Sequence, residues 1–211
     1  MTRKIFVPYD DRETVEKMGA IKGKTPYYTV PTNIDISLFK HWDRAELSPD
    51  IAGEDRTFGN NWLYVDLIPS SCWYTNVRSN IDLVDWERIK EMCRKRAGYL
   101  CELCGAKSDY SQRNYLECHE RFLFDRDTKT QKLIRFVCLC SRCHHVTHFG
   151  LSQIQGQSGE ALRHLMKVNN WNKERAGKHV EKRFEQWQIK SDMPWKLDLS
   201  MLEDMDLGIV E

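Results

Sequence analysis

The sequence contains no long hydrophobic run. No apolar stretch in its 211 residues approaches the roughly 18 residues needed to cross a bilayer. The first residues, MTRKIFVPYDD, also lack the apolar centre of a secretion signal. We therefore expect a cytoplasmic protein with no membrane partner, in which the cysteines are reduced.

Net charge is also nearly absent. The 32 lysines and arginines almost balance the 31 aspartates and glutamates, which leaves a formal net charge of +1. The two signs are unevenly distributed, because the last twenty residues carry six acids and one base whereas Arg94, Lys95 and Arg96 form a basic cluster. Such a cluster can contact phosphate, but basic residues near a helix end also suit the helix dipole. The two interpretations of this cluster are equally supported.

Internal repeats and low-complexity tracts are missing, and a hydrophobic fraction of 41% is enough for packed cores. The pattern predicts an α+β fold. Residues 1–42 alternate strand-like and helix-like segments and predict a small αβ accessory domain. Residues 43–60 are rich in Asp, Gly, Pro and Ser, which is typical of a linker. Residues 61–211 are expected to form the larger unit, with helices in its C-terminal part.

The larger unit has the clearest secondary-structure signals. Residues 61–69 predict a strand, and 83–98 predict a helix because apolar side chains recur at spacings of three and four. The runs 114–122 and 131–139 flank the polar turn DRDTKT and predict a β-hairpin. The other expected elements are strands over 4–9 and 25–31 and helices over 10–20, 35–42, 142–150, 159–171 and 172–189.

Four of the eight cysteines form two C-x2-C pairs, one before the predicted hairpin and one at its end. Tetrahedral zinc takes four soft ligands, and each C-x2-C turn presents two thiolates. The spacing therefore predicts a structural zinc site made by Cys101, Cys104, Cys140 and Cys143. The alternative to metal binding is that a cysteine is buried in the core as a small hydrophobic side chain. We expect this for three of the other cysteines. These three are Cys72, Cys93 and Cys138.

A second set of metal-binding residue types surrounds the first: Cys118, His119, His144, His145 and His148. His144 and His148 are four residues apart, so they share one face of a helix. Cys118 and His119 are neighbours on a strand and point to opposite faces, so they cannot easily bind one metal together. One of the two is expected to face the predicted helix, and the other to face outward or toward a substrate.

The segments CELCG, LECHERF and LCSRCHHVTHFG resemble the HNH, or ββα-metal, endonuclease module over roughly residues 83–150. The resemblance implies a zinc-stabilised ββα-metal domain that hydrolyses DNA phosphodiester bonds with the help of a divalent metal. It also implies catalytic roles for His119, His144 and His148. His119 would be the general base, and Cys118, His144 and His148 would hold a second divalent ion, which is Mg, Mn or Zn.

The sequence departs from the HNH pattern in two places. Cys118 replaces an oxygen or nitrogen ligand with a thiolate, which favours zinc over magnesium. The asparagine that usually braces the loop near the base has no clear counterpart, and Asn114 and Gln131 are the nearest candidates. Glu117 and Glu120 flank His119, where each carboxylate either assists a metal or faces solvent.

Residues 1–42 resemble a short domain appended to conjugative-plasmid primases and other DNA-handling proteins. The matching segments are VPY at 7–9, MGA at 18–20, YTVP at 28–31 and the closing pair Phe39 and Trp42. A tryptophan that usually follows the GA pair is replaced by Ile21-Lys22.

Two functions follow from these patterns. The favoured one is a metal-dependent DNA endonuclease. The alternative is a zinc-stabilised module without effective catalysis that binds DNA or a protein, such as a regulator or inhibitor from a mobile element. The acidic C-terminus favours the alternative slightly, because it could occupy a basic groove of the same chain or dock a basic protein partner. The histidines without metal spacing are predicted to be surface or packing residues: His41, His164 and His179.

Overall fold

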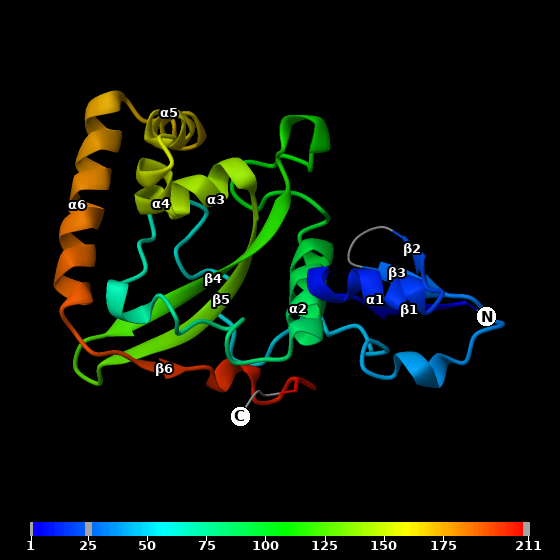
Figure 1. Cartoon of the computed structure of the whole chain (residues 1–211). Coiled ribbons are helices and arrows are strands. Elements are labelled where there is room, and N and C mark those ends of the chain that lie inside the picture. The colour runs from blue at the N-terminus through cyan, green and yellow to red at the C-terminus, as the bar shows by residue number, and fades with distance from the viewer. Residues whose placement is uncertain (1, 24–26, 209–211) are drawn as a thin grey trace.

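The computed structural model describes residues 2–23 and 27–208 and has the predicted α+β character. It contains two three-stranded sheets, in separate parts of the chain. Buried hydrophobic side chains form two clusters, one within residues 5–39 and one within residues 51–202. Figure 1 shows the small N-terminal part beside the larger hairpin and helices.

The N-terminal part is a small αβ unit. Its sheet has the order β1 (Arg3–Phe6), β3 (Tyr27–Val30) and β2 (Ile21–Lys22), with antiparallel pairing throughout. The helix α1 (Arg12–Lys17) covers this sheet and buries Val15. A 3₁₀ turn over Ile36–Phe39 replaces the helix predicted for 35–42. Thr25 and Pro26, which belong to the predicted strand 25–31, lie outside the described residues.

Residues 43–60, predicted as a linker, are tightly attached to the larger unit. The Glu54 carboxylate accepts two hydrogen bonds from Arg96, at 2.6 and 2.7 Å, and a third from the Phe136 backbone N–H at 2.9 Å. The Glu54 and Arg96 side chains are each only 2% exposed. Asp55 N–H also donates to the Ile134 carbonyl. The composition of residues 43–60 indicated a segment without helices or strands, which is correct. It could not show that this segment supplies Glu54 as the buried counter-ion of Arg96.

Replacing Glu54 with Ala is expected to lower the free energy of unfolding of the larger unit by about 3–5 kcal/mol. The substitution leaves the Arg96 guanidinium buried without a carboxylate, and removing one partner of a buried pair is costly. Urea unfolding followed by circular dichroism measures the effect. Glu46→Ala is the matched control, since Glu46 pairs with Lys95 at an exposed position and should cost less than about 1 kcal/mol. Equal effects of the two variants would contradict this account.

The centre of the larger unit is a long antiparallel hairpin. Its strands are β4 (Leu116–Asp125) and β5 (Thr130–Cys140), as the sequence predicted. Cys118 pairs with Cys138, and His119 with Val137, before the register shifts between Arg121 and Phe122. The short strand β6 (Lys196–Asp198) adds to β5 in parallel at the turn end of the hairpin.

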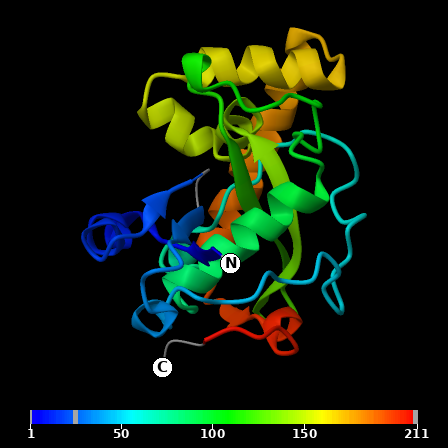
Figure 2. The same ribbon diagram turned by 90° about the vertical axis from the view of Figure 1, so that its right-hand side faces the viewer.

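Helices cover the hairpin on opposite sides. On one side lies α2 (Leu83–Arg96), and Figures 1 and 2 place it across the hairpin from the long helix α6 (Lys173–Ser191). The remaining helices gather at the end of the hairpin where β5 finishes. They are α3 (Ser141–Thr147), α4 (Phe149–Ile154) and α5 (Ser158–Asn169). Across the described residues, no helix is both long enough and apolar enough to span a membrane.

The strand predicted for residues 61–69 is wrong. Leu63 and Val65 are fully buried and alternate with partly exposed residues, which produced the strand-like pattern. The segment forms no ladder, because helix side chains satisfy its backbone. Leu63 N–H donates to Asn169 Oδ1 at 3.1 Å, and Val65 N–H donates to His179 Nε2 at 3.1 Å. Periodicity therefore identified the buried face of this segment but not its hydrogen-bond partners.

The acidic C-terminal stretch folds back onto α2. Arg88 donates to the Asp206 carbonyl and to the Asp85 carboxylate, and Gly208 N–H also donates to Asp85. Met201 and Leu202 are buried in the main core. Residues 209–211 of the predicted docking segment lie outside the described residues. The acidic stretch up to Gly208 therefore makes contacts within the same chain.

Candidate active site and cysteine cluster

The four cysteines of the two C-x2-C pairs come together as predicted. Cys101 and Cys104 lie on a loop before β4, and Cys140 and Cys143 lie where β5 passes into α3. The four sulfur atoms all lie within 4.8 Å of one another, and the Cys104 and Cys140 sulfurs are 3.6 Å apart. Two thiolates on a tetrahedral zinc, each at about 2.3 Å, are separated by roughly 3.8 Å. The cluster therefore has the donor set and the spacing for a structural zinc ion.

Neighbouring side chains hold the cysteine cluster in place. The positive φ of 71° at Gly105 suits the tight turn after Cys104. Contacts with the neighbouring thiols, chiefly that of Cys101, lower the pKa of Cys104. His164 Nε2 lies 3.2 Å from the Cys143 sulfur. His164, predicted as a surface or packing residue, thus contacts the cluster from α5.

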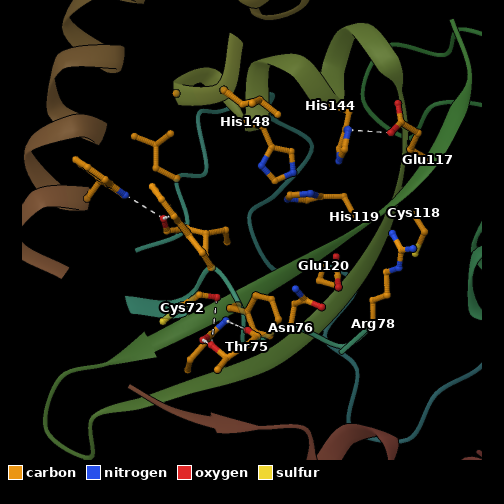
Figure 3. A pocket seen from close by; sticks show the side chains of 18 of the residues that line it. Cys72, Thr75, Asn76, Arg78, Glu117, Cys118, His119, Glu120, His144 and His148 are labelled. Atoms are coloured by element: carbon orange, nitrogen blue, oxygen red, sulfur yellow. Dashed lines mark hydrogen bonds and ion pairs between the residues drawn. The ribbon is translucent and has the colours of Figure 1, made fainter. Parts of the chain in front are cut away.

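Three histidines form a second group beside the cysteine cluster. His119 comes from β4, while His144 lies in α3 and His148 at its end. Their ligand atoms all lie within 4.8 Å of one another. The ring centroids are 4.5 to 5.4 Å apart, and Figure 3 shows the three rings turned toward a common point. The hairpin and the helix after it therefore converge on one site, as the spacing of His144 and His148 indicated.

A carboxylate orients His144, and a second carboxylate lies near His119. The Glu117 carboxylate lies 3.0 Å from His144 Nδ1 and also accepts from Ser141 Oγ at 2.8 Å. Asp66 lies 3.8 Å from His119 Nε2. A carboxylate at one ring nitrogen fixes the tautomer and leaves the other nitrogen of His144, Nε2, free to bind. Asp66 was missed by the sequence analysis, because residues 61–69 were interpreted only as a strand.

Burial favours the neutral form of His119 and of His148. Burial is the largest cause that lowers the pKa of His119 and the pKa of His148, and in His119 the nearby Asp66 opposes it. His119 Nε2 is buried and has no hydrogen-bond partner among the described residues. An unpaired buried nitrogen is costly unless something binds it. This atom therefore indicates that a ligand completes the group.

Cys118 does not join the histidines. Its side chain is buried, and this burial, together with the neighbouring Cys93 thiol on α2, raises the pKa of Cys118. Strand alternation turns His119 to the other side. The predicted ligand set of Cys118, His144 and His148 is therefore corrected to His119, His144 and His148 as the group that the fold assembles.

The candidates for the bracing asparagine also lie away from the histidines. Gln131 lies on β5 near the turn end of the hairpin, where its Nε2 donates to the Thr75 carbonyl. Asn114 Nδ2 donates to the Lys107 carbonyl within the loop that carries the first cysteine pair. Neither residue belongs to the histidine group.

A cavity of about 1010 Å³ opens in front of the histidine group. Arg78, Lys90 and Arg94 contribute positive charge to its lining, and Glu120 faces it beneath His119 (Figure 3). Burial raises the pKa of Glu120. Of the basic cluster predicted to contact phosphate, only Arg94 lines this cavity. All three residues of the cluster are paired with carboxylates: Arg94 with Glu91, Lys95 with Glu46 and Arg96 with Glu54.

Comparison of the chain with protein-family models, curated proteins and solved structures finds no match. The function is therefore inferred from the side chains alone. What they provide is a cysteine cluster that braces the hairpin and a three-histidine group that faces a cavity.

Proposed function

We propose that the protein is a metal-dependent nuclease of the HNH type, in which His119, His144 and His148 hold a divalent ion. The observation that carries the proposal is the convergence of these histidines from β4 and α3 on one face of a large cavity. The unpaired His119 Nε2 and the carboxylate behind His144 support metal binding. Structural zinc at the four cysteines would hold the two elements in register.

The proposal gives His119 a different role from the one implied by the resemblance. His119 serves as a metal ligand, because Cys118 faces the core and only His144 and His148 would otherwise remain. Three histidines form a typical open site for a divalent ion, with positions left for water and substrate. The chemistry that such an ion supplies is Lewis-acid stabilisation of charge on a scissile phosphate and its leaving oxygen.

Glu120 is the proton acceptor in this proposal. It follows His119 on β4, so its side chain leaves the opposite face of the strand, and it lines the same cavity as the histidines without being a ligand of the ion. Burial raises its pKa, which moves this carboxyl toward the range where a general base works at neutral pH. Glu117 is excluded from this role, because its carboxylate is engaged by His144 and Ser141. Its task is to orient His144.

DNA is the proposed substrate. The cavity is large enough for a nucleotide, and Arg78 in its lining can contact a phosphate next to the scissile bond. Lys90 and Arg94 also line the cavity, where they are paired with Glu87 and Glu91. Arg78 is exposed and has no carboxylate within ion-pair distance in the described part of the chain.

A nicking assay on supercoiled plasmid tests the proposal. Purified protein should convert plasmid to the open-circular form when Mg²⁺, Mn²⁺ or Zn²⁺ is added, and a chelator should stop the reaction. Protein that binds the plasmid but never nicks it with any of these ions would support the alternative, a zinc-stabilised binding module. Protein that neither binds nor nicks it would contradict both functions.

A further inference from the structure

A second cavity lies next to the histidine group. It has a volume of about 540 Å³ and is bounded by residues 58–66, by Phe122–Phe124 at the far end of β4, and by Trp171 and α6. Asp66 belongs to its lining and also lies 3.8 Å from His119 Nε2. The second cavity is therefore adjacent to the proposed catalytic site, because Asp66 in its lining lies near His119 and Phe122 lines both cavities.

The second cavity carries a surplus of positive charge. Arg175, Arg183 and Lys190 line it, whereas Asp66 is the single acidic side chain among its lining residues. Arg175 and Arg183 are eight residues apart on α6, and Lys190 follows seven residues later, so the three lie near one face of the helix. Within the described residues, none of the three has a carboxylate within 4.0 Å.

A fourth cation lies behind the wall of this cavity. Arg121 is fully buried, and its three guanidinium nitrogens have no hydrogen-bond partner in the described parts of the chain. Its guanidinium stacks on the Tyr64 ring at 4.1 Å, and Arg183 approaches the same ring at 5.0 Å. Gly59 leaves the space for this packing, because a Cβ there would overlap Arg121 Nη1. A buried cation without a counter-ion is costly, and an anion in the neighbouring cavity would offset that cost.

Aromatic side chains accompany these charges. Trp62 is 47% exposed and packs against Trp171 at 5.9 Å between ring centroids. Arg175 lies over the Trp171 ring at 4.7 Å, and Lys190 lies over the Phe124 ring at 4.4 Å. Cations that track phosphates, beside rings on which unpaired bases stack, are the combination that binds single-stranded nucleic acid. A small inorganic anion would not need the exposed tryptophan.

We propose that this second cavity binds a single-stranded stretch of nucleic acid next to the cleavage site, with Arg183 and Lys190 on its phosphates and a base on Trp62. The inference rests on the proposed nuclease function and adds a substrate class to it. A strand that enters here passes Asp66 and reaches the histidine group. The site therefore favours DNA that is unpaired on one side of the scissile bond.

Fluorescence anisotropy with a 5′-labelled single-stranded 12-mer tests the inference. The full chain is titrated in the presence of zinc but without other divalent ions, so that binding is measured apart from cleavage. The double variant R183A/K190A should bind at least about tenfold more weakly than the wild type. The slope of log Kd against log salt should fall by about 1.4, because each phosphate contact on a single strand contributes about 0.7. Trp62→Leu should also weaken binding by about tenfold.

The control is K178A/K182A, which removes two exposed lysines from the same helix outside the cavity. It should change the affinity less than twofold. If R183A/K190A fails to fold, Arg175→Ala provides a second test. Arg175 is exposed, so its replacement should not disturb folding. Wild-type protein that does not bind the 12-mer overturns the inference. Equal losses of affinity in R183A/K190A and K178A/K182A also overturn it, as does a loss of affinity that is seen only with duplex DNA.

Failure of the nuclease proposal gives a different result. If the wild type binds the 12-mer through Arg183 and Lys190 but never nicks plasmid, the binding cavity stands and the catalytic assignment falls. If the wild type nicks plasmid but R183A/K190A binds and cleaves normally, the catalytic assignment stands and the cavity has no role in substrate binding.

Discussion

Cys104→Ser is expected to remove one zinc ion per chain and to unfold the larger unit. Zinc binding to a four-cysteine site is worth roughly 10 kcal/mol or more, and the whole stability of a domain is about 5–15 kcal/mol. The cluster fixes the loop before β4, the end of β5 and the start of α3 to one another, so all three lose their common anchor. Metal analysis of the purified variant, together with circular dichroism, measures both parts of the prediction.

Cys72→Ser is the matched control for this experiment. Cys72 is a buried cysteine outside the cysteine cluster, and its replacement should cost only the few kcal/mol typical of a core substitution while zinc content stays at one per chain. A chelator should unfold the wild type in the same way as the Cys104 substitution does. Wild-type protein that contains no zinc and is indifferent to chelator would contradict a structural zinc site.

His119→Ala and Glu120→Gln are expected to abolish plasmid nicking for two different reasons. The histidine substitution removes a metal ligand, so the second divalent ion should bind at least tenfold more weakly. The glutamine substitution should leave ion affinity within about threefold and lower the cleavage rate by about 10²–10⁴-fold, the usual contribution of a general base. Titration of the zinc-loaded protein with Mn²⁺ or Ni²⁺, alongside the nicking rate, separates the two effects.

His145→Ala is the control for both variants, because His145 is an exposed neighbour of His144 that does not belong to the histidine group. It should retain ion affinity and nicking. If His119→Ala binds the ion normally but loses nicking, His119 is the base rather than a ligand. If Glu120→Gln nicks at the wild-type rate, another group takes the proton.

Local patterns in the sequence predicted the hairpin, the helix before it and the cysteine cluster. Each of these depends on residues that are close in sequence or repeat at short spacing: the polar turn between β4 and β5, the apolar positions of α2, and the two C-x2-C pairs. Strand alternation also indicated that Cys118 and His119 face opposite sides. Strand alternation could not predict which face of β4 lies toward His144 and His148. That depends on how α3 packs after Cys143.

Features that depend on distant partners were not predictable. Asp66 reaches His119 across more than fifty residues of sequence, and Arg183 reaches Tyr64 across more than a hundred. Glu54 lies in a segment whose composition is that of an ordinary loop, and only its contact with Arg96 gives it a structural role. The charges on α6 likewise have the spacing of a solvated helix face until the aromatic residues of 58–66 are placed against them.

The way in which residues 63–70 are held has a consequence for folding kinetics. Three of their backbone N–H groups donate to Asn169, His179 and Ser191, which are 106 to 121 residues further along the chain. Asp66 N–H instead donates to the Thr147 carbonyl in α3. The cysteine cluster, in contrast, closes a loop of fewer than fifty residues. Because closing a longer loop costs more entropy and contacts of large sequence separation form slowly, the zinc-bound hairpin should assemble first. The parts of this segment on either side of Asp66, which Asn169, His179 and Ser191 hold, should become ordered only when α5 and α6 dock in a later and slower phase.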